Sequence, residues 1–237
     1  LNMKKLNYEK TKVMIRNIAN PWTEVKKGKT VIKISENKYL EIVDDFKYLG
    51  AYIANCHLDF KKRKGLAWCQ FWKLTTIWKS NELSLIVKLH LFGSIILSIL
   101  FYNYETWVTT KVMKKETDSF GTSCYRYMLW IKKIDRIRNE EILQKGQRSN
   151  LSNFMYKRQL RSLGHWIRKD DIIRPFALYK NSNGKNRLGR PRLNFNKHIE
   201  KITESTTEEL IRKAQNRQEW RRDVVGRFDL QPPDWSK

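Results

Sequence analysis

The sequence is poor in cysteine, glycine and proline, and it has only half as many acidic as basic residues. Its three cysteines, Cys56, Cys69 and Cys124, stand far apart in a chain of 237 residues. An odd number of widely spaced cysteines argues against a disulfide framework and favours a reducing, intracellular compartment. There is no Cys-x-x-Cys pair and the four histidines are scattered, so we expect no zinc or other metal site in this chain.

The charge balance narrows the class of partner. Lysine and arginine number 48 against 24 aspartates and glutamates, which gives a formal net charge of +24. Hydrophobic residues make up 41% of the chain, enough to build a core and to argue against a wholly disordered chain. Such an excess of cations favours a polyanion as partner, either nucleic acid or an anionic membrane surface, over an acidic small-molecule enzyme.

Hydrophobic periodicity predicts an α+β protein, with a small antiparallel strand-rich part followed by a mainly helical part. Alternating or apolar runs, with a hairpin between the second and third, predict strands over residues 12–18, 29–34, 38–43 and 46–53. Beyond residue 58 the period becomes helical, over residues 61–79, 84–104, 121–130, 140–143, 153–168 and 200–220. The last range holds one or two helices, and Ser205-Thr-Thr-Glu208 within it is a capping signal. Large apolar residues predict the core of the first helical region: Trp68, Trp72, Trp78, Leu89, Phe92, Ile96 and Leu100.

The apolar run Leu85–Tyr102 raises the question of a membrane span. Lys88 and His90 shorten its uninterrupted part to twelve residues, whereas a helix needs about 20 to cross the hydrocarbon layer. A buried helix of a globular domain explains the run better, and we expect no membrane partner.

Neighbouring carboxylates do not make a catalytic site here. Asp44-Asp45 precedes a predicted strand, and Asp170-Asp171 follows a predicted helix, so both pairs fit solvated surface charge. Two-metal catalysis needs carboxylates that hold two ions about 4 Å apart, with a further carboxylate from elsewhere in the fold. The residues alone therefore offer no complete active site.

The strongest signal for function is a basic segment in the C-terminal third. Residues 157–192 contain eleven basic and two acidic residues, and the segment ends in Gly184-Lys-Asn-Arg-Leu-Gly-Arg-Pro-Arg192. Glycine and proline hold such a backbone turned or extended, so that its cations can reach phosphates. We expect nucleic-acid contacts from Lys157, Arg158, Arg161, Arg168, Lys185, Arg187, Arg190 and Arg192. Trp166, by contrast, fits the core.

Five collinear segments resemble parts of the endonuclease–reverse transcriptases of non-LTR (LINE-type) retrotransposons. Residues 6–14 resemble the segment after the catalytic aspartate pair, and Phe46-Lys-Tyr-Leu-Gly50 resembles the F-x-Y-L-G hairpin between palm and thumb. Leu160–Arg168 is similar to an L-R-x-L-G-H-x-x-R signature, and Gly184–Arg192 to G-K-R-x-x-G-R-P. Asn216-Arg-Gln-Glu-Trp-Arg221 is similar to a terminal D-R-x-x-W-R.

The resemblance implies the C-terminal part of an RNA-directed DNA polymerase. The parts would be a palm remnant (residues 1–57), a helical thumb-like region (58–145) and a helical, basic nucleic-acid-binding region (146–237). Lys10 and Lys12 would be the general-acid lysines, and Phe46, Tyr48, Leu49 and Gly50 would grip the primer end. The resemblance also implies that the catalytic aspartates, the fingers and the endonuclease lie upstream of Leu1. The Mg²⁺ that the family uses would then not be held by this chain.

Two functions of different class follow from these observations. In the first, the chain is a truncated reverse transcriptase that binds an RNA template, a DNA primer or target DNA but does not polymerise alone. In the second, it is a stand-alone basic nucleic-acid-binding protein without catalytic activity. Either function places the protein inside the cell, in the nucleus or in a ribonucleoprotein particle.

Overall fold

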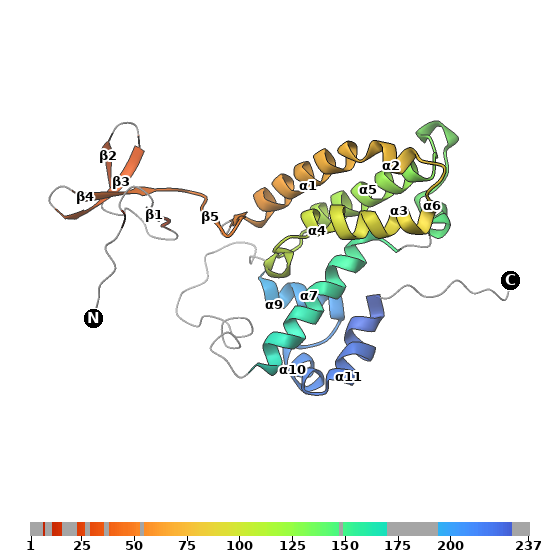
Figure 1. Ribbon diagram of the computed structural model, residues 1–237. Helices are drawn as coiled ribbons and strands as arrows, with labels where there is room; N and C mark the ends of the chain where they lie inside the picture. Colours follow the sequence, from red (N-terminus) through yellow and green to blue (C-terminus); the bar gives the residue numbers. More distant parts are fainter. Residues whose placement is uncertain are drawn as a thin grey trace. The chain divides into compact units, whose positions relative to one another are not determined.

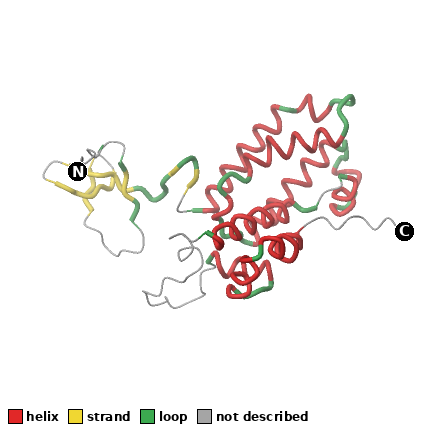
Figure 2. Tube along the Cα trace, turned by 60° about the horizontal axis from the view of Figure 1, so that its bottom comes forward, coloured by secondary structure: helices red, strands yellow, loops and turns green. Residues whose placement is uncertain are grey.

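The protein is described by a computed structural model, and the described residues are 7, 11–15, 23–26, 29–35, 38–52, 55–146, 149–169 and 194–228. The chain forms two compact units, residues 1–61 and 62–237. Strands occupy the first unit and helices the second, as the colours of Figure 2 show. The predicted α+β class is therefore confirmed. The division into three parts, at residues 57 and 145, stays a prediction.

The first unit contains a four-stranded sheet and a short hairpin. The sheet has the order β1-β4-β3-β2 (Figure 1), with β1 at Lys12–Val13, β2 at Thr23–Lys26, β3 at Lys29–Ser35 and β4 at Lys38–Ile42. Strands β3 and β4 pair antiparallel, with Val31 opposite Glu41 and Ile32 opposite Leu40, which confirms the predicted hairpin. Strand β1 pairs with β4 in parallel, unlike the other pairs of the sheet.

The short hairpin joins β5 (Lys47–Tyr48) to β6 (Ala51–Tyr52). Leu49 and Gly50, which connect the two strands, have φ angles of 47° and 86°. A two-residue loop with positive φ at both positions matches the right-handed twist of the flanking strands. Residues 47–52 thus form a hairpin, which the family resemblance implied, whereas the alternation alone predicted one strand over residues 46–53.

The second unit is helical, and polar residues define where several of its helices begin. Ser84, Thr110 and Asn194 cap α3, α5 and α9, each accepting a hydrogen bond from the backbone N–H three residues on. The helices of its first part are α1 (Cys56–Lys73, which begins in the first unit), α2 (Thr75–Lys79), α3 (Leu85–Leu91), α4 (Leu97–Leu100), α5 (Lys111–Met128) and α6 (Asn139–Lys145). A π-helix, η1 (Phe92–Ile96), joins α3 to α4, and two 3₁₀ turns, η2 (Tyr104–Thr106) and η3 (Lys133–Asp135), follow.

An aromatic core holds these helices together. The ring of Phe71 in α1 stacks on that of Trp78 at 5.2 Å, and Phe92 packs against Tyr125 at 5.6 Å between ring centres. The predicted core residues Trp78, Leu89, Phe92, Ile96 and Leu100 are buried. The prediction was wrong for Trp72, which is 51% exposed, because Ala67 and Phe71 occupy the buried face of α1. Trp68 is half-buried.

The apolar run from Leu85 to Tyr102 is not one continuous α-helix, because η1 divides it into α3 and α4. In the part of the chain that the structure describes, no helix is long and apolar enough to cross a membrane.

The C-terminal part of the second unit has a core of its own. Helix α7 (Leu151–Arg168) packs with α9 (Phe195–Thr203), α10 (Thr207–Gln215) and α11 (Arg217–Glu219), which continues as the π-helix η4 (Trp220–Val225) and the 3₁₀ turn η5 (Gly226–Phe228) (Figure 1). The buried residues of this core are Leu160, Leu163, Ile167, Ile199, Leu210, Ala214, Trp220, Val224 and Val225. Trp166 packs against this core half-buried, as expected.

Helix α10 begins with a capping box. The hydroxyl of Thr206 accepts a hydrogen bond from Glu209 N at 3.3 Å, and the Glu209 carboxylate accepts one from Thr206 N at 3.2 Å. The sequence signal therefore placed this helix start one residue too early, because the cap is Thr206 and not Ser205 and the acidic partner is Glu209 and not Glu208.

Candidate nucleic-acid interface

One face of α7 is cationic and the adjoining face is apolar. Lys157, Arg161, His165 and Arg168 follow one another at intervals of four, four and three residues, which places them on the same side of a helix. Leu160, Leu163, Gly164 and Ile167 lie between them in the sequence and are buried. The helix is therefore held by its apolar side and presents a row of cations beside it.

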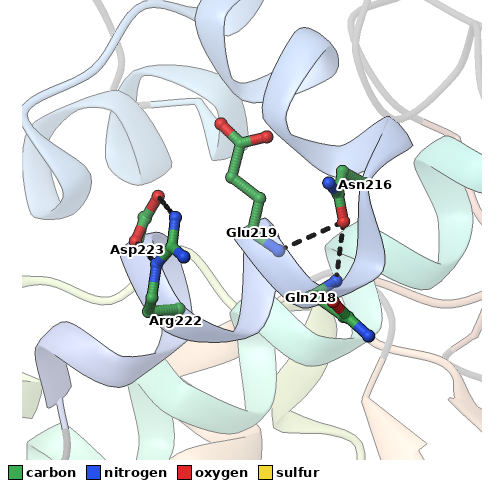
Figure 3. Close-up of polar contacts among 5 residues, drawn as sticks. All are labelled: Asn216, Gln218, Glu219, Arg222 and Asp223. Carbon is green, nitrogen blue, oxygen red and sulfur yellow. Dashed lines mark hydrogen bonds and ion pairs between the residues drawn. The ribbon is translucent and has the colours of Figure 1, made fainter.

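Helix α11 and the π-helix η4 bring two more arginines to this row. Arg217 and Arg221 stand four residues apart and are exposed. The side chain of Asn216 caps their helix, accepting hydrogen bonds from Gln218 N at 3.0 Å and Glu219 N at 3.3 Å (Figure 3). This cap fixes the start of the helix and so the positions of both arginines.

A glycine of α7 and the tryptophan of η4 join the two helices closely. The Trp220 indole is buried, and its Nε1 donates a hydrogen bond to the carbonyl oxygen of Leu160 at 3.0 Å. A Cβ atom at Gly164 would lie only 2.3 Å from that Nε1 and 2.7 Å from Cε2. Only a residue without a side chain fits at position 164, so Gly164 permits the approach of Trp220.

The two helices form a groove of about 690 Å³ between them, here called the cationic groove. Five permanent cations and one histidine supply most of its lining, and none of the described residues that line it is acidic. The lining residues are Lys157, Arg161, His165, Arg168, Arg217, Trp220, Arg221 and Val225.

The cations of the groove are close enough to disturb one another. Burial lowers the pKa of Arg168, and the positive charges of Arg217 and Arg221 lower it further. Burial and the charge of Arg161 likewise lower the pKa of Lys157. Arg168 is also fixed in place, because its Nη1 donates a hydrogen bond to the carbonyl oxygen of Ala214 at 3.0 Å. The mutual repulsion of these positive charges is unfavourable, and binding of a multiply charged anion would relieve it.

Two neighbouring cations that do not line the groove, Arg222 and Arg158, are paired with acids. The Arg222 guanidinium lies against the Asp223 carboxylate through two contacts of 2.6 and 3.1 Å (Figure 3). Arg158, predicted to contact nucleic acid, has its Nη2 3.3 Å from Glu105 Oε1, and its guanidinium lies over the Tyr104 ring. Arg158 is not among the lining residues of the cationic groove.

The structure brings only some of the predicted site residues together. Lys157, Arg161 and Arg168 share the groove, whereas Lys185, Arg187, Arg190 and Arg192 lie outside the described residues. Arg217 and Arg221 were missed as binding residues, because they are almost fifty residues from Arg168 in the chain. A glycine inside a strongly periodic helix was the signal that another element approaches α7 at that point.

The residues expected to act in polymerisation belong to the first unit. Lys12 forms an ion pair with Glu41 at 3.5 Å, and Lys10 lies outside the described residues. Phe46 is half-buried, while Tyr48 and Leu49, at the tip of the hairpin, are 57% and 75% exposed. Asp44 and Asp45 are exposed. Among the described residues, no group of three or more histidines, cysteines or acids could hold a metal ion.

Comparison with known proteins gives one informative similarity. Over 176 residues the chain is 29% identical to F52C9.6 of Caenorhabditis elegans, which is described as an uncharacterized transposon-derived protein. The match covers 70% of this chain and 60% of that protein. No family model matches the sequence, and no solved structure matches it. The similarity supports a transposon origin for the chain.

Proposed function

We propose that this chain is part of a LINE-type retrotransposon reverse transcriptase and that it binds template–primer or target nucleic acid through the cationic groove. Transposon origin has independent support from the C. elegans relative. The finer assignment is based on the five collinear segments that resemble such reverse transcriptases. Two of them, Leu160–Arg168 and Asn216–Arg221, form the two walls of the groove.

The observation that carries the proposal is the convergence of cations from two distant segments on one groove, whose described lining residues include no acid. Like charges four residues apart on a helix destabilise it by about 0.2–0.5 kcal/mol per pair. Each side of the groove contains one such pair. These are Lys157 and Arg161 on α7, and Arg217 and Arg221 on the other side. A phosphate backbone would turn these repulsions into attractions, and nucleic acid is the polyanion that a transposon protein must handle.

A stand-alone nucleic-acid-binding protein is the second candidate, and one observation favours it. The groove lies wholly within the second unit, so binding there needs no residue of the strand-rich unit. The two candidates differ in what they require of the exposed Tyr48–Leu49 tip, which resembles a primer grip. The polymerase assignment predicts that Tyr48→Ala weakens binding of a primed template more than that of the unprimed strand. The alternative predicts equal, small effects.

Titration of labelled RNA and DNA with the full chain, followed by fluorescence anisotropy, tests the groove. Arg217→Gln with Arg221→Gln removes two charges from the groove, while Arg212→Gln with Arg222→Gln removes two exposed charges that do not line it. A cation in contact with a single strand contributes about 0.7 to the slope of log K against log salt. We expect the first pair to make the slope shallower by about 1.4 and the second pair to change it far less. Equal effects of the two pairs would show that overall charge, and not the groove, binds nucleic acid.

A further inference from the structure

The loop that joins α5 to α6 (Figure 1), residues 129–138 and here called the α5–α6 loop, presents large apolar side chains and cations together to solvent. Trp130 is 58% exposed and Ile134 is 81% exposed. The exposed cations of the loop are Lys132, Lys133, Arg136 and Arg138, and Asp135 is its only acid. None of the described residues that line the cationic groove belongs to this loop, so the loop is a separate surface.

The backbone places Trp130 where a helix usually has glycine. Trp130 N donates a hydrogen bond to Tyr127 O at 3.4 Å, and Ile131 N donates one to Arg126 O at 2.9 Å. These two bonds form a Schellman motif at the end of α5, in which the residue after the C-cap takes left-handed backbone angles. Trp130 occupies that position with a φ of 60°. Because a Cβ atom makes this conformation unfavourable, a bulky residue there is an outlier.

The packing of the fold does not explain a tryptophan at this position. Among the residues that the structure describes, the Trp130 indole forms no hydrogen bond and contacts no other aromatic ring. The indole of Trp72, which is similarly exposed, packs instead against the rings of Trp68, Phe71 and Tyr127. Strained residues gather at ligand-binding sites, where the strain serves the contact with a partner. Trp130 thus offers an accessible ring on an unfavourable backbone.

Hydrogen bonds also hold the rest of the loop. Arg136 N donates to Lys133 O at 3.3 Å, and the guanidinium of Arg126 in α5 donates to Ile137 O. In the described part of the chain, the side chains of Lys133, Arg136 and Arg138 form no hydrogen bond or ion pair. The loop therefore presents free cations on a backbone that is already ordered, which reduces the entropy that binding costs.

An accessible ring beside free cations fits single-stranded nucleic acid. A single strand offers base faces that stack on aromatic side chains and phosphates that attract cations. An anionic bilayer also attracts tryptophan and cations, but anchoring at its surface uses a continuous apolar face. In the sequence of the loop, Lys132 and Lys133 separate Trp130 from Ile134. The charge of the loop and its interrupted apolar surface therefore favour a nucleic-acid strand.

We propose that the α5–α6 loop is a second nucleic-acid-binding surface, at which the Trp130 ring stacks on a base of a single strand while Lys133, Arg136 and Arg138 contact its phosphates. This inference goes beyond the proposed function, because that function needs only the cationic groove. Either surface can bind nucleic acid without the other, so their tests can fail separately.

The test compares two labelled single strands of equal length, one carrying bases and one made wholly of abasic sites. Both are titrated with the full chain carrying Arg217→Gln and Arg221→Gln, so that binding in the groove does not mask the loop. A base stacked on an aromatic ring strengthens binding by about 5-fold to 150-fold. Trp130→Leu should lose this affinity for the base-bearing strand and change binding of the abasic strand by less than about twofold. Trp130→Phe, which keeps a ring, should retain most of it.

The cations of the loop are tested in the same assay. Lys133→Gln with Arg136→Gln should weaken binding of both strands, because each strand has phosphates. Lys61→Gln with Lys62→Gln, which removes two exposed charges of α1, should change binding far less. Equal effects of the two pairs would show that overall charge acts and would overturn the role given to these cations.

Two results for Trp130 would overturn the inference and leave the cationic groove untouched. In one, Trp130→Leu binds the base-bearing strand as tightly as its parent; in the other, it loses equal affinity for both strands. Vesicle binding identifies the alternative partner: phosphatidylserine vesicles that Trp130→Asn no longer binds, with oligonucleotide binding unchanged, would assign the loop to a membrane. Trp130 lies outside the buried core, and an unchanged helical circular dichroism spectrum would confirm that each variant is folded.

Discussion

Replacing Gly164 with alanine is expected to destabilise the protein, whereas the same replacement at Gly65 is expected to stabilise it. Both glycines lie inside helices, α7 and α1. Alanine is favoured over glycine in a helix by about 0.5–1 kcal/mol. A Cβ atom at Gly65 meets no atom within 4 Å, so the favourable change is realised there. Gly65→Ala should raise the free energy of unfolding by about 0.5–1 kcal/mol.

At Gly164 the added methyl group would overlap the Trp220 ring, with three ring atoms at 2.3–2.8 Å. Moving the indole costs about 1–3 kcal/mol in packing. Its buried Nε1–H would also lose its hydrogen bond to Leu160, at a cost of about 1–3 kcal/mol. After subtracting the helix preference, we expect a net loss of about 1–5 kcal/mol. Urea unfolding followed by circular dichroism measures both variants on the same scale.

A second substitution separates this explanation from the alternative that α7 tolerates no larger residue at position 164, whatever the neighbouring side chain. With Trp220→Leu in place, the ring is gone, so Gly164→Ala should cost little or even stabilise. The double-mutant cycle would then give a coupling of at least about 1 kcal/mol. If Gly164→Ala stabilises the unaltered chain as much as Gly65→Ala does, or if the cycle shows no coupling, the indole does not sit where we describe it.

Two further predictions concern buried polar groups. Burial, together with the charge of Lys201, lowers the pKa of His198 to about 4. Between about pH 4 and 6.5 the unfolded chain therefore binds a proton that the folded protein excludes. The free energy of unfolding thus falls as the pH falls through that window. Urea unfolding at about pH 7 and 4.5 measures this change. Between the two pH values, the free energy of unfolding of the unaltered protein should fall by about 2–3 kcal/mol more than that of His198→Gln. Equal losses in the two proteins would contradict a buried neutral imidazole. Asp118 of α5 accepts hydrogen bonds from the backbone N of Ser152 at 2.8 Å and from its hydroxyl at 3.0 Å, in the first turn of α7. Asp118→Ala should lower the stability measured by thermal unfolding by about 1–3 kcal/mol. Asp118→Asn should lower it clearly less, because the amide oxygen can still accept a hydrogen bond. An asparagine variant as unstable as the alanine variant would argue against this role.

Much of the fold could be predicted from the sequence because local pattern decides it. The hairpin of β3 and β4 follows from periodicity, and the start of α10 and the extent of α7 follow from capping residues and periodicity to within two residues. Strand β2 was missed because Thr23-Glu-Val-Lys26 is short and polar, as an edge strand can be. The parallel pairing of β1 with β4 depends on the path of the chain between them, which alternation does not record.

The candidate site shows a different limit. Helical spacing places Lys157, Arg161 and Arg168 on one face of α7, so half of the groove is implicit in the sequence. The other half depends on which distant helix packs there, and that is decided by one buried contact, Trp220 against Gly164. Residue size likewise misled the prediction for Trp72, because the face of α1 that is buried is chosen by its neighbours and not by its largest side chain.

The position of Trp220 bears on how binding regions of this protein are mapped by deletion. A chain that stops at Gln215 loses Arg217 and Arg221, but it also loses Trp220, Val224 and Val225 from the C-terminal core. Loss of binding in such a fragment would reflect a collapsed helical bundle as readily as a missing contact. Point substitutions at the exposed arginines, made in the intact polypeptide, separate the two effects, whereas shortened fragments mix them.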